Sequence, residues 1–286
     1  MDTTAAPIEV QNLSRYYGAV KAVDDISFSV QRGEIFGLLG HNGAGKTTTI
    51  RMLTGRTKPT HGTAHVAGYD VVTQLDQIKP RINLVFEDQN LYERMTGQAN
   101  LAFFAELYGA PKERVATLLD RVGLDAEARK RKVKTYSSGM KQRLLIARGL
   151  INDPSILFLD EPTRGLDPSS ARELRQIVRE MSQQGTTVVL TTHYMEEADE
   201  LCDRVAFLSS GRIVAMDTPT ELKLQYGTRS ARLLLKDRSE LLVALDSPDD
   251  ARKLEQLMAD GEVLTIHSQE GTLEDVFINL AGRPLT

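Results

Sequence analysis

The sequence has little cysteine, no long apolar run and no surplus of positive charge. Cys202 is the single cysteine among 286 residues, which excludes an internal disulfide and fits a reducing compartment. The absence of any run of about eighteen apolar residues predicts that the chain does not cross a membrane by itself. The opening residues lack a basic stretch followed by an apolar core, so we expect no signal peptide. The net charge of −4, which arises beyond Thr228, gives no general attraction to nucleic acid.

A glycine-rich stretch follows a short apolar run near residue 40. Residues 35–39 predict a buried strand, and residues 40–48 read Gly-His-Asn-Gly-Ala-Gly-Lys-Thr-Thr before an apolar helix. This order matches the phosphate-binding pattern G-x-x-x-x-G-K-[ST]. Glycine permits the backbone angles at which successive N–H groups converge on phosphate oxygens, and the helix N-terminus adds its positive dipole. We expect Lys46 to reach the terminal phosphates and the Thr47 hydroxyl to bind Mg²⁺. The residues predicted to bind nucleotide here are Gly40, His41, Asn42, Gly43, Ala44, Gly45, Lys46, Thr47 and Thr48.

Two carboxylates end a second apolar run. Residues 156–159 suit a central strand buried on both faces, and Asp160 and Glu161 follow directly. Because open α/β sheets bind ligands at the carboxyl ends of their strands, we expect Asp160 to hold Mg²⁺, directly or through water, and Glu161 to polarise an attacking water. His193 follows another apolar strand, residues 186–191, and is expected at the same edge, where a contact to the γ-phosphate is favoured over a purely structural role.

Two further segments carry candidate contacts. Tyr17 precedes Gly18 between two strands predicted within residues 8–32, where its ring could stack on an adenine; a packing tyrosine is the alternative. Residues 136–140 read Tyr-Ser-Ser-Gly-Met before a helix with an apolar face. Ser137 is expected to cap this helix, and a capped N-terminus also offers N–H groups to an anion.

Gly227 is the expected boundary between two domains. Residues 1–227 would form the main body, with a helical subdomain at about residues 90–155. Residues 228–286 predict a small α+β accessory domain, with strands near 233–235, 241–245 and 263–266 and helices over 249–258 and 273–280. The basic run at residues 129–134 is interpreted as a solvated face, with lipid headgroups or an acidic partner loop as alternatives.

The order of these motifs resembles the ATP-binding subunit of an ABC transporter over nearly the full chain. The series comprises Tyr17, residues 40–48, Glu87, residues 136–140, Asp160-Glu161, Asp167 and His193. Residues 193–205 and the tail Leu273-Glu-Asp-Val-Phe277 look like the prokaryotic ABC-2 branch, which includes drug-resistance and sodium-extrusion exporters.

This resemblance implies an α/β P-loop NTPase cassette with a mixed-sheet core, an antiparallel β subdomain, a helical subdomain and the C-terminal α+β appendage. It implies ATP and Mg²⁺ as cofactors and ATP hydrolysis with Lys46, Glu161 and His193 as catalytic residues. It also implies a head-to-tail dimer, with itself or with a related ATPase subunit. In such a dimer the nucleotide lies between one phosphate loop and the other chain's Ser137, Ser138, Gly139, Met140 and Asp167.

A separate transmembrane permease would hold the chain at the cytoplasmic face of the cell membrane. Export of drugs, lipids, ions or similar cargo is the favoured function, and import remains open. A non-transport ABC ATPase acting on DNA or ribosomes and a weakly hydrolysing regulatory nucleotide-binding subunit are the alternatives; no nucleic-acid partner is expected.

Two segments depart from the family pattern. The signature Leu-Ser-Gly-Gly-Gln is replaced here by residues 136–140, so Ser138 adds a side chain where glycine is usual and Met140 loses an amide. Glu87 stands where the family has glutamine, in a loop that contacts nucleotide and metal. A carboxylate is still an oxygen ligand for Mg²⁺, yet it brings negative charge toward a polyphosphate. The hypothesis is that Glu87 makes turnover more dependent on Mg²⁺, which an unchanged Mg²⁺ dependence in Glu87→Gln would exclude.

Overall fold

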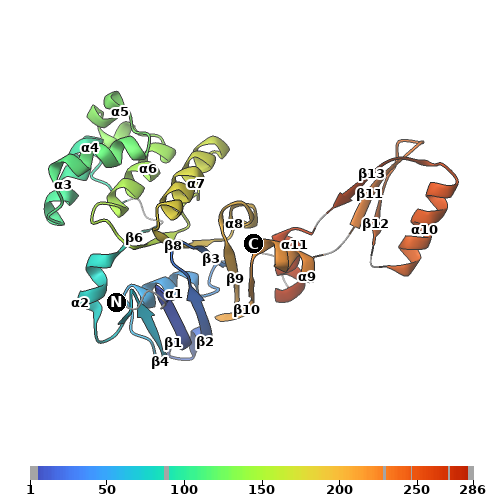
Figure 1. Ribbon diagram of the computed structural model, residues 1–286, viewed down its shortest axis with the longest axis horizontal. Helices are drawn as coiled ribbons and strands as arrows, with labels where there is room; N and C mark the ends of the chain where they lie inside the picture. Colours follow the sequence, from blue (N-terminus) through green and yellow to red (C-terminus); the bar gives the residue numbers. More distant parts are fainter. Residues whose placement is uncertain (1–5, 87–89, 228–229, 246, 270, 283–286) are drawn as a thin grey trace.

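A six-stranded sheet forms the centre of the molecule (Figure 1). The computed structural model describes residues 6–86, 90–227, 230–245, 247–269 and 271–282. The strand order is β10-β9-β3-β8-β7-β6, and neighbours run parallel except β10, which is antiparallel to β9. The strands are β3 (Ile35–Leu39), β6 (Ile82–Val85), β7 (Ile156–Asp160), β8 (Thr187–Thr192), β9 (Arg204–Ser209) and β10 (Arg212–Asp217).

Every residue of β3, β7 and β8 is buried, which explains why residues 35–39, 156–159 and 188–190 show no alternation of apolar and polar side chains. The three strands are neighbours, so their carboxyl ends meet at one edge of the sheet. That edge receives the glycine-rich loop, Asp160-Glu161 and His193.

An antiparallel sheet packs against one face of this core. Its order is β2-β1-β4-β5, and the helix α1 (Lys46–Leu53) lies between it and the central sheet (Figure 1). Phe28 of the second sheet stacks on Phe36 of β3 with ring centroids 5.2 Å apart, inside one apolar cluster shared by both sheets. The strands are β1 (Ile8–Tyr17), β2 (Val20–Val30), β4 (His61–Val66) and β5 (Tyr69–Asp70).

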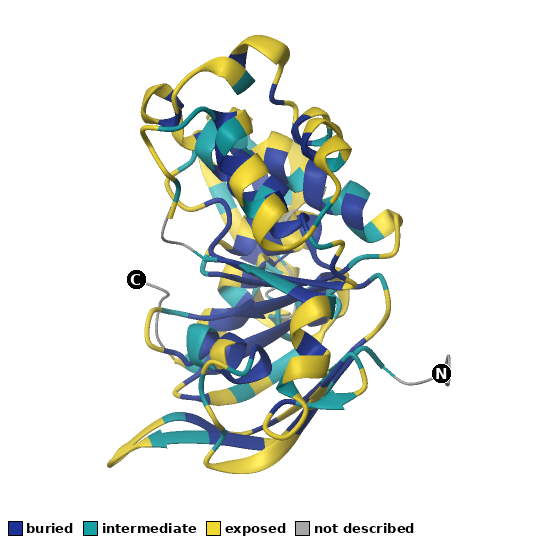
Figure 2. Cartoon of the chain, turned by 90° about the vertical axis from the view of Figure 1, so that its left-hand side faces the viewer, coloured by how far each residue is buried: buried dark blue, intermediate teal, exposed yellow. Residues whose placement is uncertain are grey.

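On the other side of the sheet, α6 and α7 pack on its strands, whereas α3 and α4 pack on α6 and α5 lies beside α3 (Figures 1 and 2). A side-chain oxygen accepts a hydrogen bond at the N-cap of four of them: Thr96 for α3, Asp125 for α5, Ser137 for α6 and Asp167 for α7. The expected cap at Ser137 is therefore confirmed. These helices are α3 (Gly97–Leu107), α4 (Lys112–Arg121), α5 (Ala126–Lys130), α6 (Ser138–Gly149) and α7 (Pro168–Gln183). Short helical segments α2 (Leu75–Ile78), η1 (Lys79–Arg81) and η2 (Val133–Thr135) connect the strands and helices.

The C-terminal segment projects from the body and then returns to it (Figure 1). A three-stranded sheet, β12-β11-β13, packs with α10 around a small apolar cluster of its own. The last helix, α11 (Leu273–Ala281), lies instead beside α9 (Pro219–Tyr226) and α8 (Met195–Leu201). Phe277 of α11 is fully buried, with its ring centroid 5.5 Å from that of Phe207 on β9. The accessory elements are β11 (Ser230–Leu235), β12 (Glu240–Ala244), α10 (Pro248–Ala259) and β13 (Val263–Gln269).

The mixed-sheet core, antiparallel subdomain, helical subdomain and C-terminal α+β segment match the expected fold class. Within the residues that the structure describes, none of the helices combines the length and apolar character needed to cross a bilayer.

Candidate functional site

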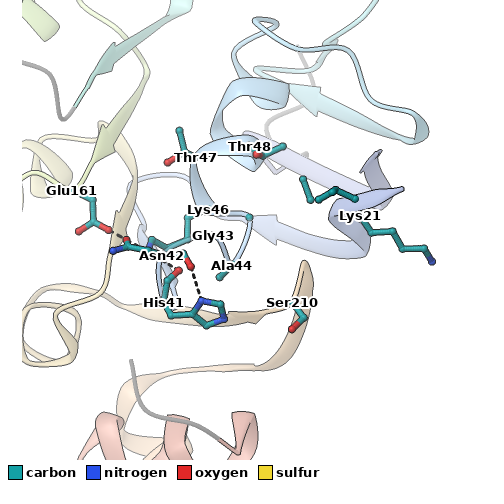
Figure 3. A pocket seen from close by; sticks show the side chains of 13 residues that line it. Lys21, His41, Asn42, Gly43, Ala44, Lys46, Thr47, Thr48, Glu161 and Ser210 are labelled. Carbon is teal, nitrogen blue, oxygen red and sulfur yellow. Dashed lines mark hydrogen bonds and ion pairs between the residues drawn. The ribbon is translucent and has the colours of Figure 1, made fainter. Parts of the chain in front are cut away.

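A cleft of about 370 Å³ opens where β3 gives way to α1 (Figure 3). Its wall is the glycine-rich loop together with the start of β2, the residue after β7 and the turn between β9 and β10. The lining residues are Val20, Lys21, Ala22, His41, Asn42, Gly43, Ala44, Gly45, Lys46, Thr47, Thr48, Glu161 and Ser210.

Glycine is required in this loop by backbone angle and by space. Gly43 and Gly45 have φ values of +79° and +113°, which disfavour residues with a Cβ. A Cβ on Gly45 would also lie 2.5 Å from the carbonyl oxygen of Ala22, and one on Gly40 would lie 2.3 Å from that of Leu208. The loop is therefore held close against β2 and β9.

Lys46 points back into the loop and meets a carboxylate. Its Nζ donates to the Gly40 carbonyl oxygen at 2.6 Å and lies 3.2 Å from Glu161 Oε1. The residues are 5% and 7% exposed, so the pair is screened little by solvent. The Lys46 ammonium is therefore already paired with the Glu161 carboxylate, which directly follows β7.

Glu161 has a second partner at the end of β8. Its Oε2 lies 2.8 Å from His193 Nδ1. Its backbone has a φ of +50°, and its N–H donates to the carbonyl and hydroxyl oxygens of Thr191. These contacts fix the carboxylate between Lys46 and His193, so residues from α1, β7 and β8 converge on one point.

A pair of oxygen ligands lies beside this point. Asp160 Oδ1 accepts a hydrogen bond from Thr191 Oγ1 at 2.5 Å and from Thr47 Oγ1 at 3.3 Å. Among the described residues there is no group of three or more histidine, cysteine or acidic side chains arranged to hold a metal. A carboxylate and a hydroxyl next to a phosphate loop suit Mg²⁺, which keeps several waters and takes one or two protein ligands plus substrate phosphates.

Tyr17 lies outside the lining of the cleft. It ends β1, its ring is 45% exposed, and the Arg15 guanidinium lies 4.4 Å from the ring centroid. A hydrogen bond with Arg15 is the main cause that lowers the pKa of Tyr17, and a hydrogen bond with Thr57 adds to it. The Arg15 guanidinium therefore occupies one face of the ring.

The residues of the predicted signature also lie apart from this cleft. Ser137 and Ser138 are exposed at the start of α6, where Ser137 Oγ accepts from the Met140 N–H at 3.2 Å. Gly139 is buried against α7, and the two helices are so close there that a Cβ on Gly139 would lie 2.4 Å from Ser170 Oγ. The Met140 sulfur accepts from Arg131.

Asp167 caps α7 through the N–H groups of Ser169 and Ser170, and the hydrogen bond from the Ser170 hydroxyl is the largest cause that lowers the pKa of Asp167. Asp167 is not among the residues that line the cleft. Glu87, predicted to contact nucleotide and metal, lies outside the described residues.

Four lining residues were not anticipated from the sequence: Val20, Lys21, Ala22 and Ser210. The Ser210-Gly211 turn is recognisable as the link between two strands, but its role at the cleft depends on the Gly211 N–H donating to the Ala44 carbonyl at 3.0 Å. That contact joins segments far apart in the chain, and no local pattern signals it.

Comparisons with known proteins agree with this geometry. Residues 23–164 match the family described as "ABC transporter". The chain is 45% identical to the fluoroquinolones export ATP-binding protein of Mycobacterium tuberculosis, covering 98% of this chain and 94% of that protein. It is 38% identical to the daunorubicin/doxorubicin resistance ATP-binding protein of Streptomyces peucetius, covering 97% and 93%. A solved structure described as the ATP binding subunit of an ABC transporter superposes with a TM-score of 0.68 at 31% identity, covering 77% of this chain and 92% of that one.

These matches confirm the resemblance drawn from the motif order and the fold class expected from it. The chain belongs to the ABC transporter family, as an ATP-hydrolysing subunit that powers a separate membrane permease.

Proposed function

We propose that the cleft between the glycine-rich loop and Glu161 binds ATP with Mg²⁺ and hydrolyses it, and that the energy drives export of drugs, lipids, ions or similar cargo. The observation that carries the proposal is the convergence of Lys46, Glu161 and His193 beside a loop of which two glycines have positive φ and line the cleft. Cations, N–H groups and a general base are what phosphoryl transfer to water requires.

Each residue has a step in this scheme. The N–H groups of residues 43–48 and the Lys46 ammonium bind the β- and γ-phosphates. Glu161 accepts a proton from a water whose oxygen attacks the γ-phosphorus as the bond to the β-phosphate oxygen breaks, releasing ADP and phosphate. Asp160 and Thr47 would hold Mg²⁺, which neutralises the developing charge on the phosphate oxygens.

The hydrogen bond between His193 and Glu161 restricts which ring nitrogen of His193 can donate to a phosphate. Because the Glu161 carboxylate can only accept, Nδ1 carries the hydrogen of the bond between the two side chains. Nε2 can therefore donate to a phosphate oxygen only if it is protonated as well, or if ATP first releases Nδ1 from Glu161.

The placement of residues 137–140 supports a two-chain site. They are not among the residues that line the cleft of their own chain, whereas Ser137 and Ser138 are exposed at a helix N-terminus that suits an anion. A head-to-tail pair, of two copies or with a related ATPase subunit, would bring them and Asp167 to the other chain's ATP. Glu87 completes the proposed nucleotide and metal contacts.

The export direction and the type of cargo come from the relatives. Their names refer to fluoroquinolones export and to daunorubicin and doxorubicin resistance. The proposed location is the cytoplasmic face of the cell membrane, where the permease holds the chain. The proposed division places the ATP-binding domain up to residue 227 and the accessory domain after it, with α11 folded back onto the body.

Substitution of Lys46 tests the proposed site. Lys46→Ala should abolish binding of MgATP and phosphate release by the full chain, whereas Lys79→Ala should leave both unchanged, since Lys79 is an exposed partner of Asp76. Retained ATP binding in Lys46→Ala would place the nucleotide elsewhere.

A further inference from the structure

A buried carboxyl group lies directly behind the catalytic cluster. Glu197 is on α8, four residues after His193, and only 2% of its surface is exposed. Neither of its carboxyl oxygens has a hydrogen-bond partner of acceptable geometry among the described residues. An acidic side chain in this condition is costly to the fold, so its retention inside the protein calls for a physical reason.

Two hydroxyl groups flank this carboxyl. Thr163 follows Glu161 in the turn after β7, and Thr192 is the last residue of β8, next to His193. Both are buried, and both lie close enough to Glu197 to stabilise negative charge on it, although neither reaches hydrogen-bond geometry in this conformation. Glu197 thus lies between the two segments that carry the proposed general base and the proposed phosphate contact.

The surroundings favour the neutral form of Glu197. Burial is the largest cause acting on the pKa of Glu197 and raises it. The Thr192 and Thr163 hydroxyls each lower this pKa by less than burial raises it. The charge of Glu161 raises it further, and Arg175 lowers it. Arg175 is itself paired with Glu200 at 2.9 Å.

Cations on the neighbouring elements have other partners on α8: Arg179 of α7 donates to the Glu200 carbonyl oxygen, and Lys223 of α9 pairs with Asp199. β3 and β8 contribute no titratable side chain, and of the first-turn acidic residues of α11, Glu274 is exposed and Asp275 is half-buried. Glu197 in turn contributes, after burial, to raising the pKa of the Cys202 thiol.

We infer that Glu197, as a neutral carboxylic acid, is a positioning residue that joins the Thr163 turn to Thr192 and so fixes Glu161 and His193 relative to each other. A protonated carboxyl has one donor and free acceptor sites, so it can donate to one threonine hydroxyl and accept from the other. An ionised carboxylate could only accept, and it would add negative charge next to Glu161. The inference rests on the proposed function, because the two segments it joins carry the proposed catalytic residues.

Two replacements separate positioning from packing. Glu197→Gln keeps a donor and an acceptor in the same shape without charge, and it should keep kcat for phosphate release within about twofold of the parent. Glu197→Leu keeps the bulk and removes the polar groups, and it should lower kcat about tenfold with the KM for ATP little changed, the loss expected when one orienting hydrogen bond is removed. Glu196→Gln and Glu196→Leu are the matched controls, because Glu196 is the exposed neighbour on the same helix.

The inference is overturned if Glu197→Leu turns over at the parental rate, or if Glu197→Gln, folded, falls as far as Glu197→Leu. Failure of the proposed function has a different signature, since the parent chain itself would then not hydrolyse ATP.

The protonation state of Glu197 can be tested by NMR titration and by stability measurements, neither of which depends on catalysis. The ¹³C carboxyl resonance that disappears in Glu197→Gln should titrate in the parent above the ordinary glutamate value of 4.5. Because the folded state then binds a proton that the unfolded state has released, the parent should lose stability relative to Glu197→Gln as the pH rises from about 4.5 through the raised value. A resonance that titrates at the ordinary value, with a stability difference independent of pH, contradicts the inference.

Discussion

Lys46 Nζ lies 3.2 Å from Glu161 Oε1, inside the cleft that would receive the phosphates. The carboxylate of the proposed general base therefore holds the cation proposed to bind ATP, and its other oxygen holds His193. A γ-phosphate entering the cleft has to compete with Glu161 for both partners. In this account, arrival of the nucleotide also releases Glu161 to act on water.

Gly139 of α6 lies close against Ser170 of α7. A Cβ at position 139 would lie 2.4 Å from Ser170 Oγ and 2.7 Å from Ser170 Cβ. We expect Gly139→Ala to lower the free energy of unfolding by about 1–3 kcal/mol through overpacking. Denaturant unfolding measures the loss, and Ser138→Ala, at the exposed neighbouring position, is the control.

The same contact provides a rescue test. Ser170→Gly removes both atoms that the new Cβ would meet, so the double variant Gly139→Ala/Ser170→Gly should be more stable than the sum of the two single changes predicts. Strict additivity would show that Gly139 is not required by this close approach.

Phe277 ties the C-terminal helix to the body. Its ring is fully buried against Phe207, whereas the next residue, Ile278, is 38% exposed. Phe277→Ala should destabilise the full chain by about 3–5 kcal/mol, and Ile278→Ala by much less, because only the first leaves a cavity. Equal effects of the two changes in denaturant unfolding would mean that α11 does not pack on the body in solution.

Asp24 links the antiparallel sheet to β10. It accepts hydrogen bonds from the Tyr16 hydroxyl at 2.6 Å and from Arg212 Nη2 at 2.7 Å, and these bonds lower its pKa to about 2 from 3.8. Because the pKa of Asp24 is lower in the folded state, its ionised carboxylate stabilises the fold above pH 3.8. This contribution is lost as the pH falls from 3.8 to about 2.

Asp24→Asn should therefore be less stable than the parent at neutral pH, with the difference closing across that acid range. Thermal unfolding against pH measures this, with the exposed Asp76→Asn as control. A difference that persists unchanged at pH 2 would assign the effect to packing instead.

The local parts of the site could be predicted from the sequence, whereas its long-range contacts could not. The strand, glycine loop and helix over residues 35–53 form one continuous pattern, and the apolar run before Asp160 places two carboxylates at a strand end. These features depend on near neighbours in the chain, where residue type largely determines conformation.

The contacts of Lys46 with Glu161 and of Gly139 with Ser170 depend on how distant elements pack. The return of α11 to α8 and α9 is of the same kind, because its amphipathic pattern indicates a buried face and not the partner that covers it. Burial of Glu197 is equally hidden, since an acidic residue on a short helix is usually exposed.

The most direct test of the account compares MgATP binding and phosphate release in Glu161→Gln and in the parent chain. Loss of the general base should slow phosphate release by at least about a hundredfold. Loss of the competing negative charge beside Lys46 should leave ATP binding as tight as in the parent or tighter. Parental turnover in Glu161→Gln, or slow turnover caused only by weak ATP binding, would contradict the central role given to Glu161.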